Sequence, residues 1–201
     1  MNFCAAVNSI IHAGAQPVLA DIDPVSLNLN VCEIEKKITS KTRAVLVVHF
    51  AGRPCDMDSI VELARSRNNK IIEDCAHALE TEYKAKKAGT IGDLGCFSFY
   101  ATKNITTGEG GMVISCVESL ISRIKVMAIH GMSSNAWKRF SDSGYKHYFV
   151  EEAGFKCNMM DIQAAIGIHQ LRKIESFWQR LQKIWNMYLE RQGLSECIRL
   201  W

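Results

Sequence analysis

The chain has 201 residues, of which 48% are hydrophobic and 22% are charged, and its formal net charge is +3. This composition predicts a packed core in one large domain, or most of one, and argues against disorder. The basic residues are scattered and no apolar run approaches the roughly 20 residues of a bilayer-spanning helix, so neither a nucleic-acid face nor a membrane segment is expected.

Strand and helix signals alternate along the chain, which is typical of a mostly parallel sheet covered by helices on both faces. Apolar residues at helical spacing predict helices at about 5–13, 31–38, 57–64, 119–130 and 161–169, with an apolar stripe that continues to 191 and is expected to pack. Short apolar runs predict strands at about 17–21, 44–50, 70–74, 95–100 and 111–115. We expect a hairpin or loop at 79–92 and a long loop at 137–153.

Several residues have the types that end or begin helices. Gly14 suits the position just after a helix, where a left-handed backbone is common. Asn30 and Asp56 precede predicted helices, and their side chains are of the kind that caps a free backbone N–H group.

The eight cysteines contain no C-x-x-C pair, and the six histidines have no metal-ligand spacing, so no metal site is predicted. Cys75, Cys96 and Cys116 fall within or beside predicted buried strands, where cysteine packs as a small apolar residue. Unpaired cysteines suit a reducing compartment, and the N-terminus lacks the basic segment of a signal peptide. We therefore expect a cytoplasmic protein.

Two chemically active residues follow predicted strands. Lys103 lies on a loop after the strand at 95–100, just before the glycine-rich turn at 108–111, and Asp74 ends the strand at 70–74. A lysine in partly dry surroundings can lose its proton and condense with an aldehyde. A carboxylate beside a pyridine nitrogen keeps that nitrogen protonated. The pair therefore predicts a site for pyridoxal phosphate.

Five segments, in order, resemble the DegT/StrS-type family of pyridoxal-phosphate sugar aminotransferases, which have the aspartate-aminotransferase fold. They are residues 8–18, 73–78, 97–99 with 103–104, 109–111 and 154–159, and the resemblance runs from Asn8 through Tyr188. It implies a three-layer α/β/α large domain of the pyridoxal-phosphate fold type I, with a mostly parallel sheet. Residues 1–170 would form that cofactor-binding domain without its N-terminal strand and helix, and 171–201 would lead towards a small C-terminal domain that is absent. A chain truncated at both ends is therefore expected.

The resemblance assigns the chemistry to two residues. Lys103 matches the Schiff-base lysine, which also moves the proton between the substrate carbon and the cofactor. Asp74 matches the acid that pairs with the pyridinium nitrogen. The implied reaction is transfer of an amino group, from glutamate, to a nucleotide-linked keto-sugar in polysaccharide biosynthesis.

Four further residues would bind the cofactor. By resemblance, His77 lies near the ring oxygen, Ser98 supplies a phosphate-binding hydroxyl and Phe3 stacks on the ring. Asn158 matches an asparagine that reaches the phosphate from a neighbouring subunit, which implies a homodimer with shared active sites.

Each candidate also has a structural interpretation. Lys103 could be a solvated surface lysine, Asp74 and Asn158 could cap helices or turns, and His77, Ser98 and Phe3 could be ordinary packed residues. His49, at the end of an apolar run, is expected to be structural. Glu80 and Ala85 stand where the family usually has glycine, and either would be strained at a positive φ angle.

Other functions stay open at this point. An aminotransferase acting on a cyclitol or another carbocyclic ketone has the same signature in this stretch. A non-catalytic remnant would follow from the missing phosphate-binding segment. A sugar dehydratase of the same family is disfavoured, because those enzymes carry histidine where this chain has Lys103.

Overall fold

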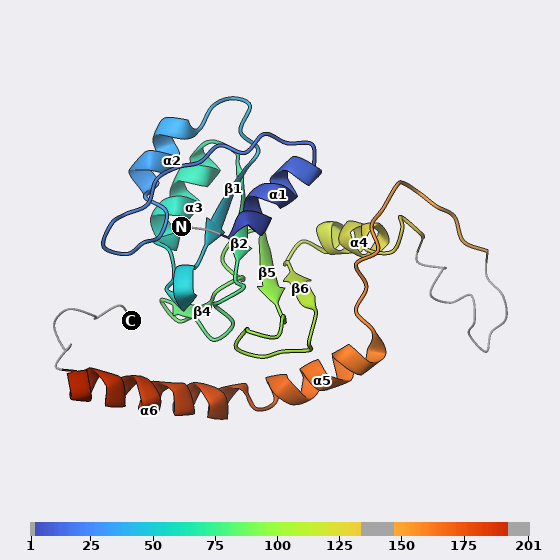
Figure 1. Cartoon of the computed structure of the whole chain (residues 1–201). Coiled ribbons are helices and arrows are strands. Elements are labelled where there is room, and N and C mark those ends of the chain that lie inside the picture. The colour runs from blue at the N-terminus through green and yellow to red at the C-terminus, as the bar shows by residue number, and fades with distance from the viewer. Residues whose placement is uncertain (1–2, 134–146, 193–201) are drawn as a thin grey trace.

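The computed structural model describes residues 3–133 and 147–192, so part of the predicted long loop at 137–153 lies outside the described residues. Four strands form the central sheet in the order β1-β2-β5-β6: β1 (Ala44–Val48), β2 (Lys70–Asp74), β5 (Leu94–Ser98) and β6 (Gly111–Ile114). The first three are parallel and β6 is antiparallel to β5 (Figure 1). The predicted α/β class with a mostly parallel sheet is confirmed.

The helices lie close to their predicted positions. They are α1 (Cys4–His12), α2 (Val31–Lys37), α3 (Met57–Ser66), α4 (Glu118–Met127), α5 (Asp161–Leu171) and α6 (Ile174–Gln192), with a short 3₁₀ turn at Phe50–Gly52. Gly14 has φ +74, as expected after α1, and the Asn30 side chain accepts a hydrogen bond from Cys32 N–H at the start of α2. Asp56 caps no backbone group of α3; its carboxylate instead accepts hydrogen bonds from the hydroxyls of Ser59 and Tyr83.

The main core lies between β1, β2, α2 and α3. Alternate residues of β1, Val45 and Val47, are buried against Met57, Ile60 and Ala64 of α3, which recur at helical spacing. Each large apolar side chain buried in this way contributes roughly 1.5–3 kcal/mol relative to exposure. This core fixes the position of β2, whose last residue is a candidate catalytic group.

The predicted strand at 17–21 does not form. Residues 17–21 belong to no strand: Asn30 N–H donates to the carbonyl of Asp21, an isolated bridge follows between Ile22 and Leu29, and Val18 and Leu19 are 63% and 67% exposed. Within the described residues no strand lies beside it, and a strand is stable only when its backbone groups are paired in a ladder. A short apolar run alone therefore overestimates this element.

Residues 79–92 form the hairpin that was one of two predicted outcomes, with β3 (Glu82–Tyr83) antiparallel to β4 (Lys86–Lys87). Its two turn residues, Lys84 and Ala85, have φ +49 and +63. The expected backbone strain is thus present at Ala85. It is absent at Glu80, which does not have a positive φ angle.

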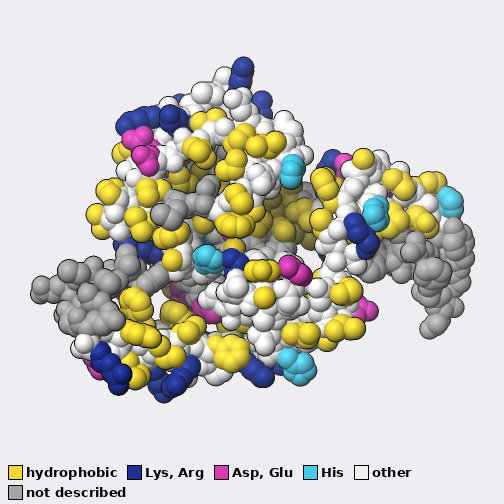
Figure 2. Space-filling model, in the orientation of Figure 1, with side chains coloured by type: hydrophobic (Ala, Val, Ile, Leu, Met, Phe, Trp, Pro, Cys, Tyr) yellow, Lys and Arg dark blue, Asp and Glu magenta, His cyan; other side chains and the backbone are white. Residues whose placement is uncertain are grey.

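Helices α5 and α6 form an arm that runs beneath the ends of the strands (Figure 1). The apolar stripe along this arm was expected to pack, but much of it is exposed, and Figure 2 shows apolar side chains gathered there. The most exposed include Ile162, Leu171, Leu181 and Tyr188. Among the described residues, none of the helices combines the length and apolar character needed to cross a bilayer.

Candidate active site at the carboxyl ends of the strands

Two candidate loops meet at one edge of the sheet. β2 and β5 are parallel, with Asp74 opposite Cys96, so the segments that follow them leave from the same edge. Open parallel sheets place ligand sites at this edge, outside the carboxyl ends of their strands. The structure therefore brings the segment after Asp74 and the loop that carries Lys103 together.

The loop at 99–110 is closed at its base. Phe99 N–H donates to the carbonyl of Gly110 at 2.8 Å, and Thr107 N–H donates to the carbonyl of Phe99 at 2.9 Å. Ile105 and Thr107 are buried, so the later part of the loop is anchored in the protein. Lys103 lies in the tip, half-buried, where its N–H donates to the carbonyl of Tyr100 at 3.0 Å.

Lys103 contacts His77 directly. The Nζ of Lys103 lies 2.8 Å from Nε2 of His77, which joins the loop after β5 to the turn after β2. Burial lowers the pKa of His77, the positive charge of Lys103 lowers it further, and Asp74 acts in the opposite direction without reversing the shift. The imidazole is therefore neutral near neutral pH. Because an ammonium group has only donors, Nε2 accepts the hydrogen bond from Lys103.

Asp74 is half-buried at the end of β2. Its Oδ1 accepts a hydrogen bond from Ala76 N–H at 3.0 Å, and its carbonyl accepts one from His49 N–H at 3.2 Å. The first bond fixes the direction of the carboxylate and the second ties the end of β2 to the end of β1. Asp74 and Lys103 thus both lie close enough to His77 to influence its charge.

Ser98, Phe3 and Asn158 stand apart from this contact. Ser98 is the last residue of β5, half-buried at the same sheet edge, and its Oγ accepts from Tyr100 N–H at 3.4 Å. Phe3 precedes α1 and is 75% exposed. Asn158 is exposed and its side chain accepts a hydrogen bond from Lys156 Nζ. No contact between described residues joins Phe3 or Asn158 to Lys103, so their roles stay predictions.

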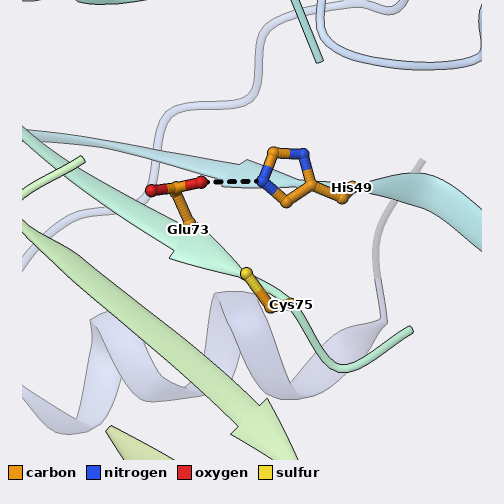
Figure 3. Close-up of side chains that lie close together, drawn as sticks. All are labelled: His49, Glu73 and Cys75. Atoms are coloured by element: carbon orange, nitrogen blue, oxygen red, sulfur yellow. Dashed lines mark hydrogen bonds and ion pairs between the residues drawn. The ribbon is translucent and has the colours of Figure 1, made fainter. Parts of the chain in front are cut away.

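An interaction that the sequence did not predict lies on the other face of β2. The carboxylate of Glu73 lies 3.0 Å from Nε2 of His49, and both side chains are fully buried (Figure 3). Because Nδ1 of His49 accepts a hydrogen bond from Cys55 N–H at 3.1 Å, Nε2 carries the proton and donates it to Glu73. His49 is therefore structural, as expected, but with a specific buried partner.

Glu73 also holds the segment that leads into β5. Its oxygens accept hydrogen bonds from the N–H groups of Gly89 and Ile91 at 2.8 Å and of Gly92 at 2.5 Å. The backbones pack closely here, since a Cβ on Gly95 would lie 2.3 Å from the carbonyl oxygen of Gly89. Glu73 thus positions the start of β5 relative to β2.

His49, Glu73 and Cys75 lie close enough together to suggest metal ligands, and Figure 3 shows the three side chains. Both ring nitrogens of His49 and both oxygens of Glu73 are already engaged in hydrogen bonds. Burial, followed by the charges of Glu73 and Asp74, raises the pKa of the Cys75 thiol. A thiol that keeps its proton is a poor metal ligand, so we assign this cluster a structural role.

Comparisons with known proteins identify relatives of the chain. The chain is 46% identical over 188 residues to the spore coat polysaccharide biosynthesis protein SpsC of Bacillus subtilis. It is 40% identical over 188 residues to the GDP-perosamine synthase of Escherichia coli O157:H7. Both matches cover 94% of this chain, but 48% and 49% of the relatives, so the chain spans about half the length of the curated relatives it matches.

The fold is similar to that of Spr1654 from Streptococcus pneumoniae in its PLP-form. The TM-score is 0.85 at 29% identity, and the match covers 98% of this chain and 52% of that one. The family comparison extends over almost the whole sequence, from residue 1 to residue 198. The chain belongs to the DegT/DnrJ/EryC1/StrS aminotransferase family.

Proposed function

We propose that the protein transfers an amino group to a keto-sugar, using pyridoxal phosphate as cofactor. The main structural support for this proposal is the contact of 2.8 Å between Lys103 Nζ and His77 Nε2, with Asp74 beside them at one sheet edge. Family membership supports the reaction type. Further, we propose glutamate as the amino donor and a nucleotide-linked sugar as the acceptor.

The residues present fit pyridoxal phosphate chemically. Lys103 offers an amine to the aldehyde, Asp74 offers a carboxylate to the ring nitrogen, and Ser98 offers a hydroxyl to the phosphate. When bound, the cofactor supplies an electron sink for the carbanion that forms at the substrate carbon. Asp74 stabilises a proton on the ring nitrogen by its negative charge, which strengthens that sink.

His77 has a defined part in this proposal. Lys103 must lose a proton before its amine can act as a nucleophile or a base. The neutral imidazole of His77, 2.8 Å away, accepts a hydrogen bond from the Lys103 ammonium and holds the amine at this edge of the sheet. Lys103, once deprotonated, is then able to remove and return a proton at the substrate carbon.

The names of the relatives support the substrate class. One relative is a GDP-perosamine synthase and another is a spore coat polysaccharide biosynthesis protein. A nucleotide-linked keto-sugar in polysaccharide biosynthesis is the acceptor that fits both names.

We also propose a homodimer with shared active sites. Asn158 is exposed, and within the described residues no contact joins it to Lys103. That placement suits a side chain that reaches the phosphate of a neighbouring subunit. The exposed apolar residues of α5 and α6 provide surface that a second subunit could bury.

A cytoplasmic location completes the proposal. The seven cysteines among the described residues are all free. Free thiols, several of them exposed, persist most readily in a reducing compartment.

Replacement of Lys103 tests the function. Lys103→Ala should abolish both the visible absorption band of the bound cofactor and transamination between glutamate and a GDP-linked keto-sugar. Lys125→Ala, which removes an exposed lysine on α4, should leave both unchanged. Retained transamination in Lys103→Ala would refute the assignment. A wild-type protein that develops no visible band with pyridoxal phosphate would instead indicate a non-catalytic remnant.

A further inference from the structure

Among residues 3–133 and 147–192, two side-chain contacts tie the tip of the Lys103 loop to the rest of the protein. Lys103 Nζ contacts His77, and the Asn104 side-chain amide donates to Oε2 of Glu80 at 2.8 Å. Both partners lie in the segment that follows β2. The tip itself has one backbone bond of its own, between Lys103 N–H and the carbonyl of Tyr100.

Of these two contacts, the one to Glu80 is better suited to fix the backbone. The lysine side chain has four rotatable bonds, so its amine is well placed only if the Cα atom is held. Asn104 is the next residue, and its short side chain passes any restraint directly to the backbone beside Lys103. A glycine at position 80, the residue usual in the family, has no side chain that could hold Asn104.

Glu80 also carries a cost. It is half-buried, and its Oε1 is withdrawn from solvent with no hydrogen-bond partner among the described residues. A carboxylate oxygen in that state destabilises the folded protein. Glu80 does not have a positive φ angle, so its backbone conformation gives no separate reason for the residue at this position. Glu80 thus destabilises the fold but holds the loop tip. We therefore attribute its presence at this position to its effect on the tip.

We propose that Glu80 is a positioning residue, which fixes the backbone beside Lys103 through Asn104 and thereby holds Nζ at His77. The catalytic consequence of this placement rests on the proposed function. The placement itself is a property of the protein without cofactor, and it can be measured separately.

The pKa of His77, followed by NMR in the cofactor-free protein, reports the placement. Lys103 and Asp74 are the charged groups that act on His77, and Lys103 lowers its pKa. Glu80→Ala frees the loop tip, so Lys103 leaves His77 and the pKa of His77 should rise. A direct electrostatic effect of removing a negative charge at position 80, if there were one, would instead lower that pKa. The sign of the change therefore separates positioning from direct electrostatics.

Further variants sharpen the test. Asn104→Ala should raise the pKa of His77 as Glu80→Ala does. Glu80→Gln keeps an acceptor for Asn104 and should not raise it. Lys103→Met should raise it most, and adding Glu80→Ala to Lys103→Met should cause no further rise. Glu82→Ala, which removes a nearby exposed acid from β3, serves as the matched control and should have no effect.

A second measurement links placement to reactivity. Glu80→Ala should slow the capture of added pyridoxal phosphate by about tenfold, since small misplacements of a reacting group have large effects on rate. Glu80→Gln should stay within about twofold of the wild type, as expected for a conserved geometry.

The proposal is overturned if Glu80→Ala folds but leaves the pKa of His77 unchanged or lowers it. It is also overturned if Glu80→Gln and Glu80→Ala behave alike. Should Glu80→Ala fail to fold, Asn104→Ala decides the matter, because no rise in that variant contradicts the proposal. If the variants show the expected pKa changes but the wild-type protein catalyses no transamination, the positioning role of Glu80 stands and the proposed function is wrong.

Discussion

Glu73 and Asp74 are consecutive residues of β2, and they point to opposite faces of the sheet, where their surroundings differ. The Glu73 carboxylate is fully buried and accepts hydrogen bonds from His49 and from the N–H groups of Gly89, Ile91 and Gly92. Within residues 3–133 and 147–192, the half-buried Asp74 carboxylate accepts one, from Ala76 N–H.

This difference separates stability from function at the level of single residues. On the Glu73 face, both carboxylate oxygens of Glu73 and both ring nitrogens of His49 are hydrogen-bonded to protein groups. These buried polar atoms therefore need no ligand. On the Asp74 face, the carboxylate, His77 and Lys103 retain capacity to bind something else. We infer that Glu73 holds the strands in register while Asp74 is left available for the cofactor.

Removal of each carboxylate provides the strongest test of this comparison. Glu73→Ala would leave a buried imidazole N–H and three buried or partly buried backbone N–H groups without their acceptor. We expect a loss of about 3–5 kcal/mol in the free energy of unfolding, as for other buried pairs that lose one partner. Urea denaturation followed by circular dichroism would measure it.

Asp74→Ala is the contrasting variant. It should change the free energy of unfolding by less than about 1 kcal/mol, because the side chain is half-buried and makes one local bond. It should nevertheless weaken cofactor binding and remove the visible band. If the two variants were equally destabilised, the proposed division between the two faces would be wrong.

The acid dependence of stability gives a second, smaller test. Burial alone would raise the pKa of Glu73, but the hydrogen bonds from His49 and from the N–H groups of Gly92, Gly89 and Ile91 outweigh it, and the pKa lies below its ordinary value of 4.5. With a depressed folded-state pKa, the unfolded chain binds the proton more readily. The stabilisation is therefore complete above about pH 4.5 and is lost as the pH falls through the folded-state value.

Glu73→Gln removes this titration. The variant should be less stable than the wild type near neutral pH, and the difference between the two should narrow steadily as the pH falls below about 4.5. Unfolding free energies measured in urea across this pH range would show the narrowing. A gap that stays constant with pH would mean that folding does not lower the pKa of Glu73.

The two faces also differ in how far the sequence could predict them. Lys103 and Asp74 each follow an apolar run, and the carboxyl ends of parallel strands share an edge, so their common edge follows from pattern and topology. The roles of Asn30 at the start of α2 and Gly14 after α1 were also predictable, because helix capping depends on residues close in sequence.

The Glu73 network could not be predicted, because its partners come from distant segments. Three of its four donors are backbone N–H groups at 89–92. Every non-proline residue has such a group, so the sequence does not distinguish these three. The available signal was one polar residue at the end of each of two neighbouring apolar runs, His49 and Glu73. Pairing of Val48 with Asp74 brings these residues together, and that register is a tertiary property.

The strand wrongly predicted at 17–21 illustrates the same limit from the other side. Its apolar pattern is suitable, but a strand depends on a neighbour that supplies hydrogen bonds along its length. The exposed stripe on α5 and α6 has a suitable helical period, but packing requires a surface to pack against. Local pattern predicts what a segment can form, and contacts decide whether it does.

The smallest expected effect lies in the hairpin between β2 and the segment held by Glu73. Ala85 has φ +63, where a residue with a Cβ atom costs about 1–2 kcal/mol relative to glycine. Glycine also has more freedom in the unfolded chain, which offsets about 0.4–1 kcal/mol of that gain. Ala85→Gly should therefore raise the free energy of unfolding by roughly 0.5–1 kcal/mol, measured by urea denaturation.

Ala13→Gly is the matched control, since Ala13 is also exposed but has φ −78, where glycine relieves no strain. It should lower stability by about 0.4–1 kcal/mol through the unfolded chain alone. Because the hairpin turn contacts neither His77 nor Lys103, Ala85→Gly should also leave cofactor capture unchanged. A stabilised variant with altered capture would show that the two faces of β2 are coupled after all.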